Sequence, residues 1–116
     1  MIRLPTAEAA LEAYRALAHL GVPRPVLRDG DVGILESCIQ RATTTIYGTE
    51  AYPTIHDKVA AIADSVSRNH PLIDGNKRLA YVLQVMVYSA NGYVSAAAGS
   101  QADLFVAIAR GDLGVR

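Results

Sequence analysis

The stretch that decides the fold reads Asn69-His70-Pro71-Leu72-Ile73-Asp74-Gly75-Asn76-Lys77-Arg78, and an apolar run from Leu79 to Tyr88 follows it directly. Proline and glycine are typical of a loop, whereas the apolar run is typical of a buried helix. The first N–H groups of a helix have no partner within the helix, and the helix dipole favours negative charge there. A loop with a histidine, a carboxylate, an amide and two cations at this place therefore predicts an anion-binding site.

The helix behind the loop is expected to begin at about Gly75 or Asn76 and to end at Ala90, before Asn91 and Gly92. Apolar side chains cover almost every face of it, as in a central helix that other helices surround. Capping residues and apolar spacing predict four more helices. Their expected ranges are 6–20, 32–47, 55–69 and 100–110. The sequence thus predicts an all-α fold, with five to six helices around a buried central helix.

Two interpretations are open for the segment 48–53, between the second and third expected helices. The β-branched residues at positions 43–46 weaken the helix prediction just before it, because such side chains are unfavourable in helices. The segment is either a plain connector or a flap that lies over a substrate chain. The core face expected for the second helix consists of Ile34, Leu35, Cys38, Ile39 and Ala42.

The composition indicates a single globular domain over residues 1–116. Eleven basic and eleven acidic residues balance, so no global charge steers the chain toward nucleic acid or a membrane. The single cysteine, Cys38, cannot form an internal disulfide and is expected to be buried and inert. The N-terminus lacks the apolar core of a signal peptide, and no apolar run is long enough to span a bilayer. We therefore expect a cytoplasmic protein.

The loop itself allows several kinds of chemistry. Too few histidine and cysteine ligands are present for structural zinc, whereas magnesium held by Asp74 and a substrate phosphate fits the residue types. Arg68, Lys77 and Arg78 are basic, but no basic stripe or aromatic platform accompanies them, which argues against nucleic-acid binding. The remaining functional hypothesis is phosphoryl or nucleotidyl transfer, and the alternative is a solvated turn in which Asp74 caps the helix. Composition alone does not separate these two.

The residues from His70 to Arg78 resemble the signature of the Fic/Doc superfamily, His-x-Phe-x-(Asp/Glu)-(Gly/Ala)-Asn-(Lys/Gly)-Arg. Lysine at position 77 is similar to the Doc (death-on-curing) branch, and so is the absence of a second arginine at position 81, where Tyr81 stands. The resemblance covers roughly residues 30–114. It departs from the pattern at Leu72, where an aromatic residue is usual and normally inserts into the core.

This resemblance implies an all-helical toxin of a toxin–antitoxin pair. Such a toxin uses ATP and Mg²⁺ to phosphorylate a threonine of elongation factor Tu, which arrests translation, and a Phd-like or other small antitoxin neutralises it. His70 would be the general base, and Asp74 would bind magnesium or align the nucleophile. The phosphate or nucleotide would be bound by Gly75, Asn76, Lys77 and Arg78, with Arg68 as a weaker candidate. The alternatives are transfer of AMP to a protein hydroxyl and an idle fold that acts by binding.

Overall fold

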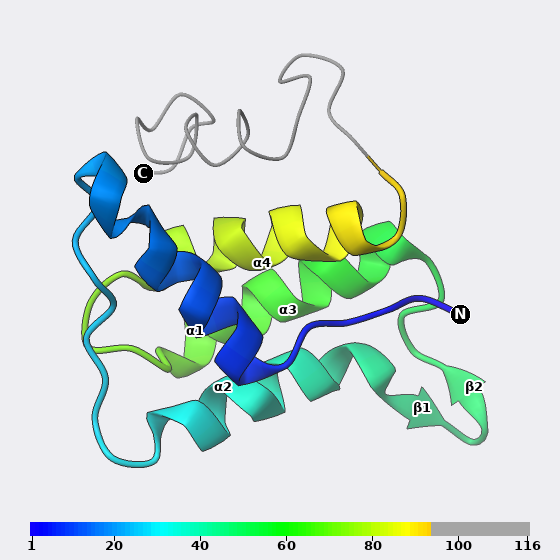
Figure 1. Cartoon of the computed structure of the whole chain (residues 1–116). Helices are drawn as coiled ribbons and strands as arrows, with labels where there is room; N and C mark the ends of the chain where they lie inside the picture. Colours follow the sequence, from blue (N-terminus) through cyan, green and yellow to red (C-terminus); the bar gives the residue numbers. More distant parts are fainter. Residues whose placement is uncertain (94–116) are drawn as a thin grey trace.

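Four α-helices and a short β-hairpin make up residues 1–93, the part of the chain that the structure, a computed structural model, describes (Figure 1). The α-helices are α1 (Ala7–Ala16), α2 (Asp31–Gln40), α3 (Ile55–Asn69) and α4 (Asn76–Ala90). Short 3₁₀ helices extend α1 over Leu17–Leu20 and α2 over Arg41–Thr43. The prediction of an all-α fold is confirmed, while the helix expected at 100–110 lies outside the described residues.

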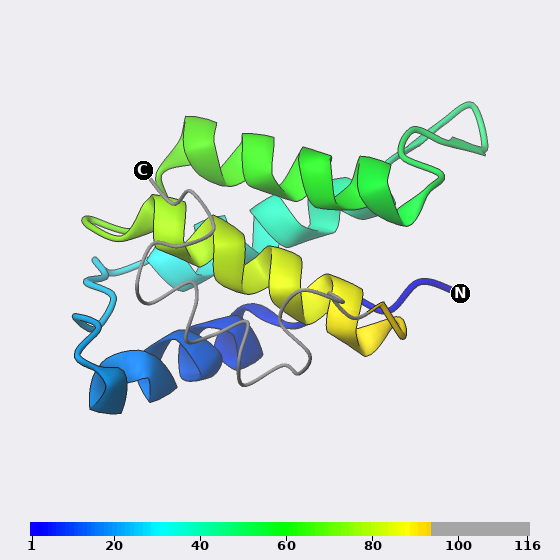
Figure 2. The ribbon, with the colours of Figure 1, turned by 90° about the horizontal axis from the view of Figure 1, so that it is seen from above.

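The two helices on either side of the loop, α3 and α4, form the most extensive helix contact in the described part of the chain. Seen from above, α4 lies between α3 and α1 (Figure 2). The fourth helix, α2, packs mainly against α1 and α3. One core joins all four, and its largest fully buried side chains include Leu11, Leu35, Ile62, Leu79 and Leu83.

Local sequence explains where α1, α3 and α4 begin and end. Thr6 accepts the N–H of Ala9 at the start of α1, and a left-handed Gly21 ends its 3₁₀ extension. Thr54 forms a capping box with Asp57 at the start of α3. At the start of α4 the N-cap is a left-handed Gly75 without a side-chain cap, so the alternative in which Asp74 caps the helix is not observed.

The predicted second helix was too long. Regular α-helix ends at Gln40, and residues 45–50 form a hairpin in which β1 (Thr45–Ile46) pairs with β2 (Thr49–Glu50). The β-branched run favours the extended chain, and Tyr47 and Gly48 both have positive φ, as a tight two-residue turn requires. The core face of α2 was right apart from Ile34, which is 40% exposed, and Cys38 is buried as expected.

A buried lysine fastens this hairpin to α3. The ammonium of Lys58 donates to the carbonyl oxygen of Ala42 at 2.9 Å and to Oε1 of Glu50 at 3.0 Å. Lys58 is only 5% exposed, although its charge suggests a surface position. The hairpin lies at the end of α3 far from the loop, because α3 begins after it and ends at His70 (Figure 1).

A search for membrane-spanning segments among residues 1–93 finds no helix with the length and apolar character to cross a bilayer.

Candidate active site

The turn that ends α3 presents His70 to solvent. Its backbone is left-handed, with φ of 45° and ψ of 63°, and its N–H closes the last turn of the helix on Val66. Left-handed backbone is uncommon for a residue with a side chain, and such strain often lies at functional sites. The following proline prevents the helix from continuing, so the chain turns away and leaves the imidazole exposed.

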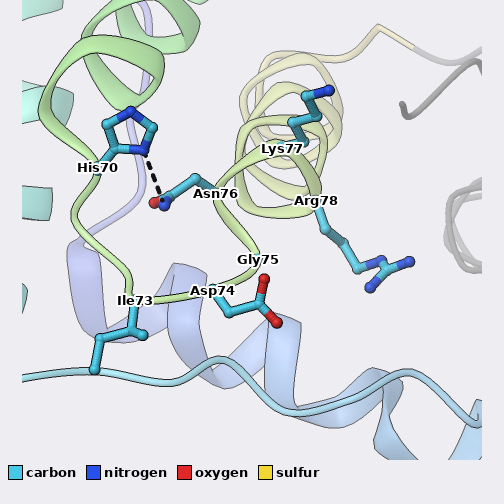
Figure 3. Close-up of a pocket in the computed structure, with 7 residues that line it drawn as sticks. All are labelled: His70, Ile73, Asp74, Gly75, Asn76, Lys77 and Arg78. Carbon is cyan, nitrogen blue, oxygen red and sulfur yellow. Dashed lines mark hydrogen bonds between the residues drawn. The ribbon is translucent and has the colours of Figure 1, made fainter.

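The side chain of Asn76 holds the loop together from inside (Figure 3). Its Oδ1 accepts the N–H of Leu72 at 3.0 Å, and its Nδ2 donates to the carbonyl oxygen of Leu72 at 2.9 Å. These two bonds fix which end of the amide faces His70, so Nδ2 points at the imidazole Nδ1 at 3.5 Å. At this length the contact is weak, and it can be a hydrogen bond only when Nδ1 carries no proton.

A second element, the extended segment before α2, supports the loop from outside. The N–H of Ile73 donates to the carbonyl oxygen of Val26 at 2.8 Å, and Val26 and Asp74 form an isolated antiparallel bridge. The guanidinium of Arg28 donates to the carbonyl oxygen of His70 at 2.9 Å. The loop is therefore fixed by contacts that span more than forty residues of sequence.

Helix α1 contributes Tyr14, which is 2% exposed and whose hydroxyl lies against Gly75. Gly75 has φ of 98°, and a Cβ atom at this position would overlap the tyrosine oxygen. Both the backbone conformation and the close approach thus require glycine. Burial raises the pKa of the Tyr14 hydroxyl, while its hydrogen bond with Arg78 opposes the increase and the charge of Asp74 adds to it.

These residues surround an open pocket of about 350 Å³ at the start of α4 (Figure 3). This volume lies at the lower end of the range for small-molecule sites. The residues that line it are His70, Ile73, Asp74, Gly75, Asn76, Lys77 and Arg78. The predicted site is therefore brought together at one place, with one exception. Arg68 does not line the pocket but donates to Asp64 at 3.0 Å on the surface of α3.

The charges in the pocket are arranged on two sides of the loop. In Figure 3, Asp74 and Arg78 extend on the side where α1 passes, whereas Lys77 projects away from them. Nε of Arg78 is buried and has no hydrogen-bond partner within the described part of the chain. The two cations Lys77 and Arg78 lie beside the N-terminus of α4, so the pocket fits an anionic ligand.

Among the residues that line the pocket, only Asp74 carries a carboxylate. Residues 1–93 contain no group of three or more histidine, cysteine, aspartate or glutamate side chains placed to hold a metal ion. Magnesium commonly needs only one or two carboxylates when substrate phosphates supply further ligands. Asp74, exposed at the mouth of the pocket, meets that requirement only together with a nucleotide.

Two supporting residues, Tyr14 and Arg28, were not predicted as part of the site. The signal available for Tyr14 was its hydroxyl, since a buried tyrosine normally needs a polar partner. Arg28 lies in the loop before α2, and nothing in its local sequence indicates contact with His70. The segment 48–53, for which a connector and a flap were both open, overlaps the hairpin up to Glu50 and does not line the pocket.

The structural class is that of an all-α domain with an anion-binding pocket at the start of a helix, where His70 is one of the lining residues. Residues 5–88 match the model of the Fic/DOC family, and the chain belongs to this family. It is 42% identical over 71 residues to Toxin Doc of Mycolicibacterium smegmatis. That match covers 61% of this chain and 55% of the relative, so the chain spans about half of the relative's length. The predicted membership in the Doc branch is thereby supported, and no solved structure matches the chain.

Proposed function

We propose that this chain acts as a Doc-like toxin that transfers the γ-phosphate of ATP to a threonine of elongation factor Tu. The observation that carries the proposal is a pocket in which an exposed histidine, a carboxylate and a helix start with glycine at its N-cap lie together. Each of the three needs of phosphoryl transfer, a base, an anion cradle and charge neutralisation, has a residue there. The similarity to a Doc toxin supports the same function.

In this proposal His70 accepts the proton of the target hydroxyl. The amide of Asn76 directs an N–H toward Nδ1, so the electron pair of the neutral imidazole is on that atom. At 3.5 Å the contact is weak, and the incoming hydroxyl can replace it. The hydrogen bond from Arg28 to the carbonyl oxygen of His70 keeps the residue in its strained conformation.

The start of α4 binds the phosphates. Gly75 lets the backbone N–H groups approach closely, and Lys77 and Arg78 neutralise charge from opposite sides of the loop. A magnesium ion held by Asp74 and the nucleotide would add further neutralisation of the transferred group. An antitoxin, Phd-like or of another small class, completes the proposed system as the neutralising partner.

A second candidate is transfer of AMP to a protein hydroxyl, since the same pocket could place the α-phosphate rather than the γ-phosphate. The features that favour the kinase are Lys77, where Fic-type relatives have glycine, and Tyr81, where they commonly have a second arginine. A labelled nucleotide separates the two reactions directly.

The test uses purified elongation factor Tu and ATP labelled at either the γ or the α position. We expect label only from the γ position, and His70→Ala should lower the rate by about 10²–10⁴, as loss of a general base does. His19→Ala is the matched control, because His19 is exposed and outside the pocket. Label from the α position alone would indicate AMP transfer. No transfer from either, by a folded protein that still binds its antitoxin, would indicate an idle fold.

A further inference from the structure

Tyr14 is the buried polar group nearest the pocket to which the proposed chemistry gives no role. It lies in the last turn of α1, more than fifty residues before the loop in sequence, and is 2% exposed. The ring belongs to the core, which a phenylalanine could equally fill. The hydroxyl is the atom of Tyr14 that comes closest to the loop, so it needs an explanation of its own.

Three groups of the pocket lie near this hydroxyl. It lies against the backbone of Gly75, at the point where the phosphates are proposed to bind. Arg78 lowers the pKa of this hydroxyl and the charge of Asp74 raises it, so both side chains lie near it. The hydroxyl therefore lies near both the cation and the carboxylate of the site.

The Arg78 side chain needs a neighbouring polar group to be held in one conformation. An arginine side chain has four rotatable bonds, and fixing them costs up to about 2 kcal/mol. The guanidinium in this structure is held with its Nε buried and unpaired within the described residues. A neutral oxygen beside the guanidinium can fix its orientation and leave its positive charge available. An aspartate or glutamate in the same place would neutralise that charge.

We propose that Tyr14 is a positioning residue: its hydroxyl orients the Arg78 guanidinium toward the phosphates of the bound nucleotide. The inference rests on the proposed function for the identity of the ligand, but it concerns binding and not transfer. The tyrosine lowers the cost of ordering Arg78 before the nucleotide arrives. Its removal should therefore weaken ATP binding and leave the affinity for the protein acceptor unchanged.

The test is a double-mutant cycle on ATP affinity, measured by calorimetry with Mg²⁺ and without any acceptor. Tyr14→Phe keeps the ring and removes the hydroxyl, and we expect the Kd for ATP to rise about tenfold, as for loss of a hydrogen bond to a charged group. In an Arg78→Gln background the same change should alter the Kd by less than about twofold, because the residue through which Tyr14 acts is gone.

Tyr52→Phe is the matched control. Its hydroxyl accepts Nε of Arg41 at 3.2 Å, outside the pocket, and its loss should leave the Kd for ATP unchanged. A Tyr14→Phe protein that binds ATP like the unmodified protein would overturn the inference. So would an equal loss in both backgrounds, which would show a general structural effect.

The cycle also keeps this inference separate from the proposed function. If the unmodified protein binds ATP but transfers no label, the proposed transfer reaction is wrong, and the two Kd ratios still decide the role of Tyr14. If it binds no ATP at all, both are wrong.

Discussion

Gly75 is the residue at which the site tolerates the least change. Its positive φ is strained for any residue with a side chain, and the Tyr14 hydroxyl occupies the place of a Cβ atom. The sequence predicted Gly75 as part of the phosphate site, and the positive φ is seen only in the structure. The second requirement arises from α1 and is visible only in three dimensions.

Gly75→Ala should lower the free energy of unfolding by more than the roughly 1–2 kcal/mol expected from left-handed backbone alone. Chemical denaturation measures this. Gly21→Ala is the control for the backbone term, because Gly21 has φ of 87° and nothing within 4 Å of its ideal Cβ position. Equal losses in the two variants would contradict a steric role for Tyr14. The added variant Tyr14→Phe should recover part of the loss at Gly75, since it removes the overlapping atom.

At the scale of the element, the start of α2 connects to the site through one ion pair. Asp31 is the first residue of α2 and is 2% exposed. Its Oδ2 accepts the backbone N–H of Arg28 at 2.8 Å and the side-chain Nε at 3.0 Å. The same arginine donates to His70, so the carboxylate fixes the loop by way of Arg28.

These contacts give a prediction for acid stability. The backbone N–H of Arg28 and its guanidinium lower the pKa of Asp31 below its ordinary value of 3.8, despite burial. A carboxylate with a lowered pKa stabilises the fold above that ordinary value, and the contribution is lost as the pH falls through the lower folded value. Asp31→Asn should therefore reduce the decline of unfolding free energy as the pH falls below about 4. Denaturation at a series of pH values measures the decline.

The neighbouring exposed carboxylate provides the control for this prediction. Asp29→Asn changes the same formal charge two positions away, and no hydrogen bond to it is seen in the described part of the chain. Its pH profile should follow that of the unmodified protein. If Asp31→Asn also followed it, the ion pair would not be a source of acid sensitivity.

The hairpin shows why element boundaries were the weakest part of the prediction. Residues 41–47 carry both an apolar helical pattern and a β-branched run, and only long-range contacts decide between them. Lys58 supplies such contacts by bonding Ala42 before the hairpin and Glu50 within it. No local pattern predicts that a lysine in the first turns of α3 is buried.

At the scale of the whole molecule, the parts that could be predicted were those contained in a short stretch of sequence. The loop, the bounds of α3 and α4 and six of the seven residues lining the pocket follow from local chemistry between positions 55 and 91. Contacts between distant segments could not be predicted. Tyr14 and Arg28 reach the loop only because α1 and the segment before α2 pack against it.

Leu72 connects the loop to the core that all four helices share. It stands where relatives usually have an aromatic side chain, and it is 1% exposed, so its expected insertion into the core is confirmed. Because the surrounding core is closed around a leucine, Leu72→Phe should cost about 1–3 kcal/mol from overpacking, although it restores the usual residue. Leu72→Met, of similar volume, should cost less than about 1.5 kcal/mol. Denaturant unfolding measures both.

The two variants also show whether the core of this chain is adapted to leucine or still has room for the aromatic residue that is usual in the family. If the whole core is adapted to leucine, stability falls with added volume, and phosphate transfer falls with it because the loop shifts with its anchor. A phenylalanine variant as stable as the unmodified protein would instead mean that the core has room for the ring. The loop would then owe its conformation to Asn76 and Arg28 rather than to Leu72, because their hydrogen bonds do not depend on the volume at that position.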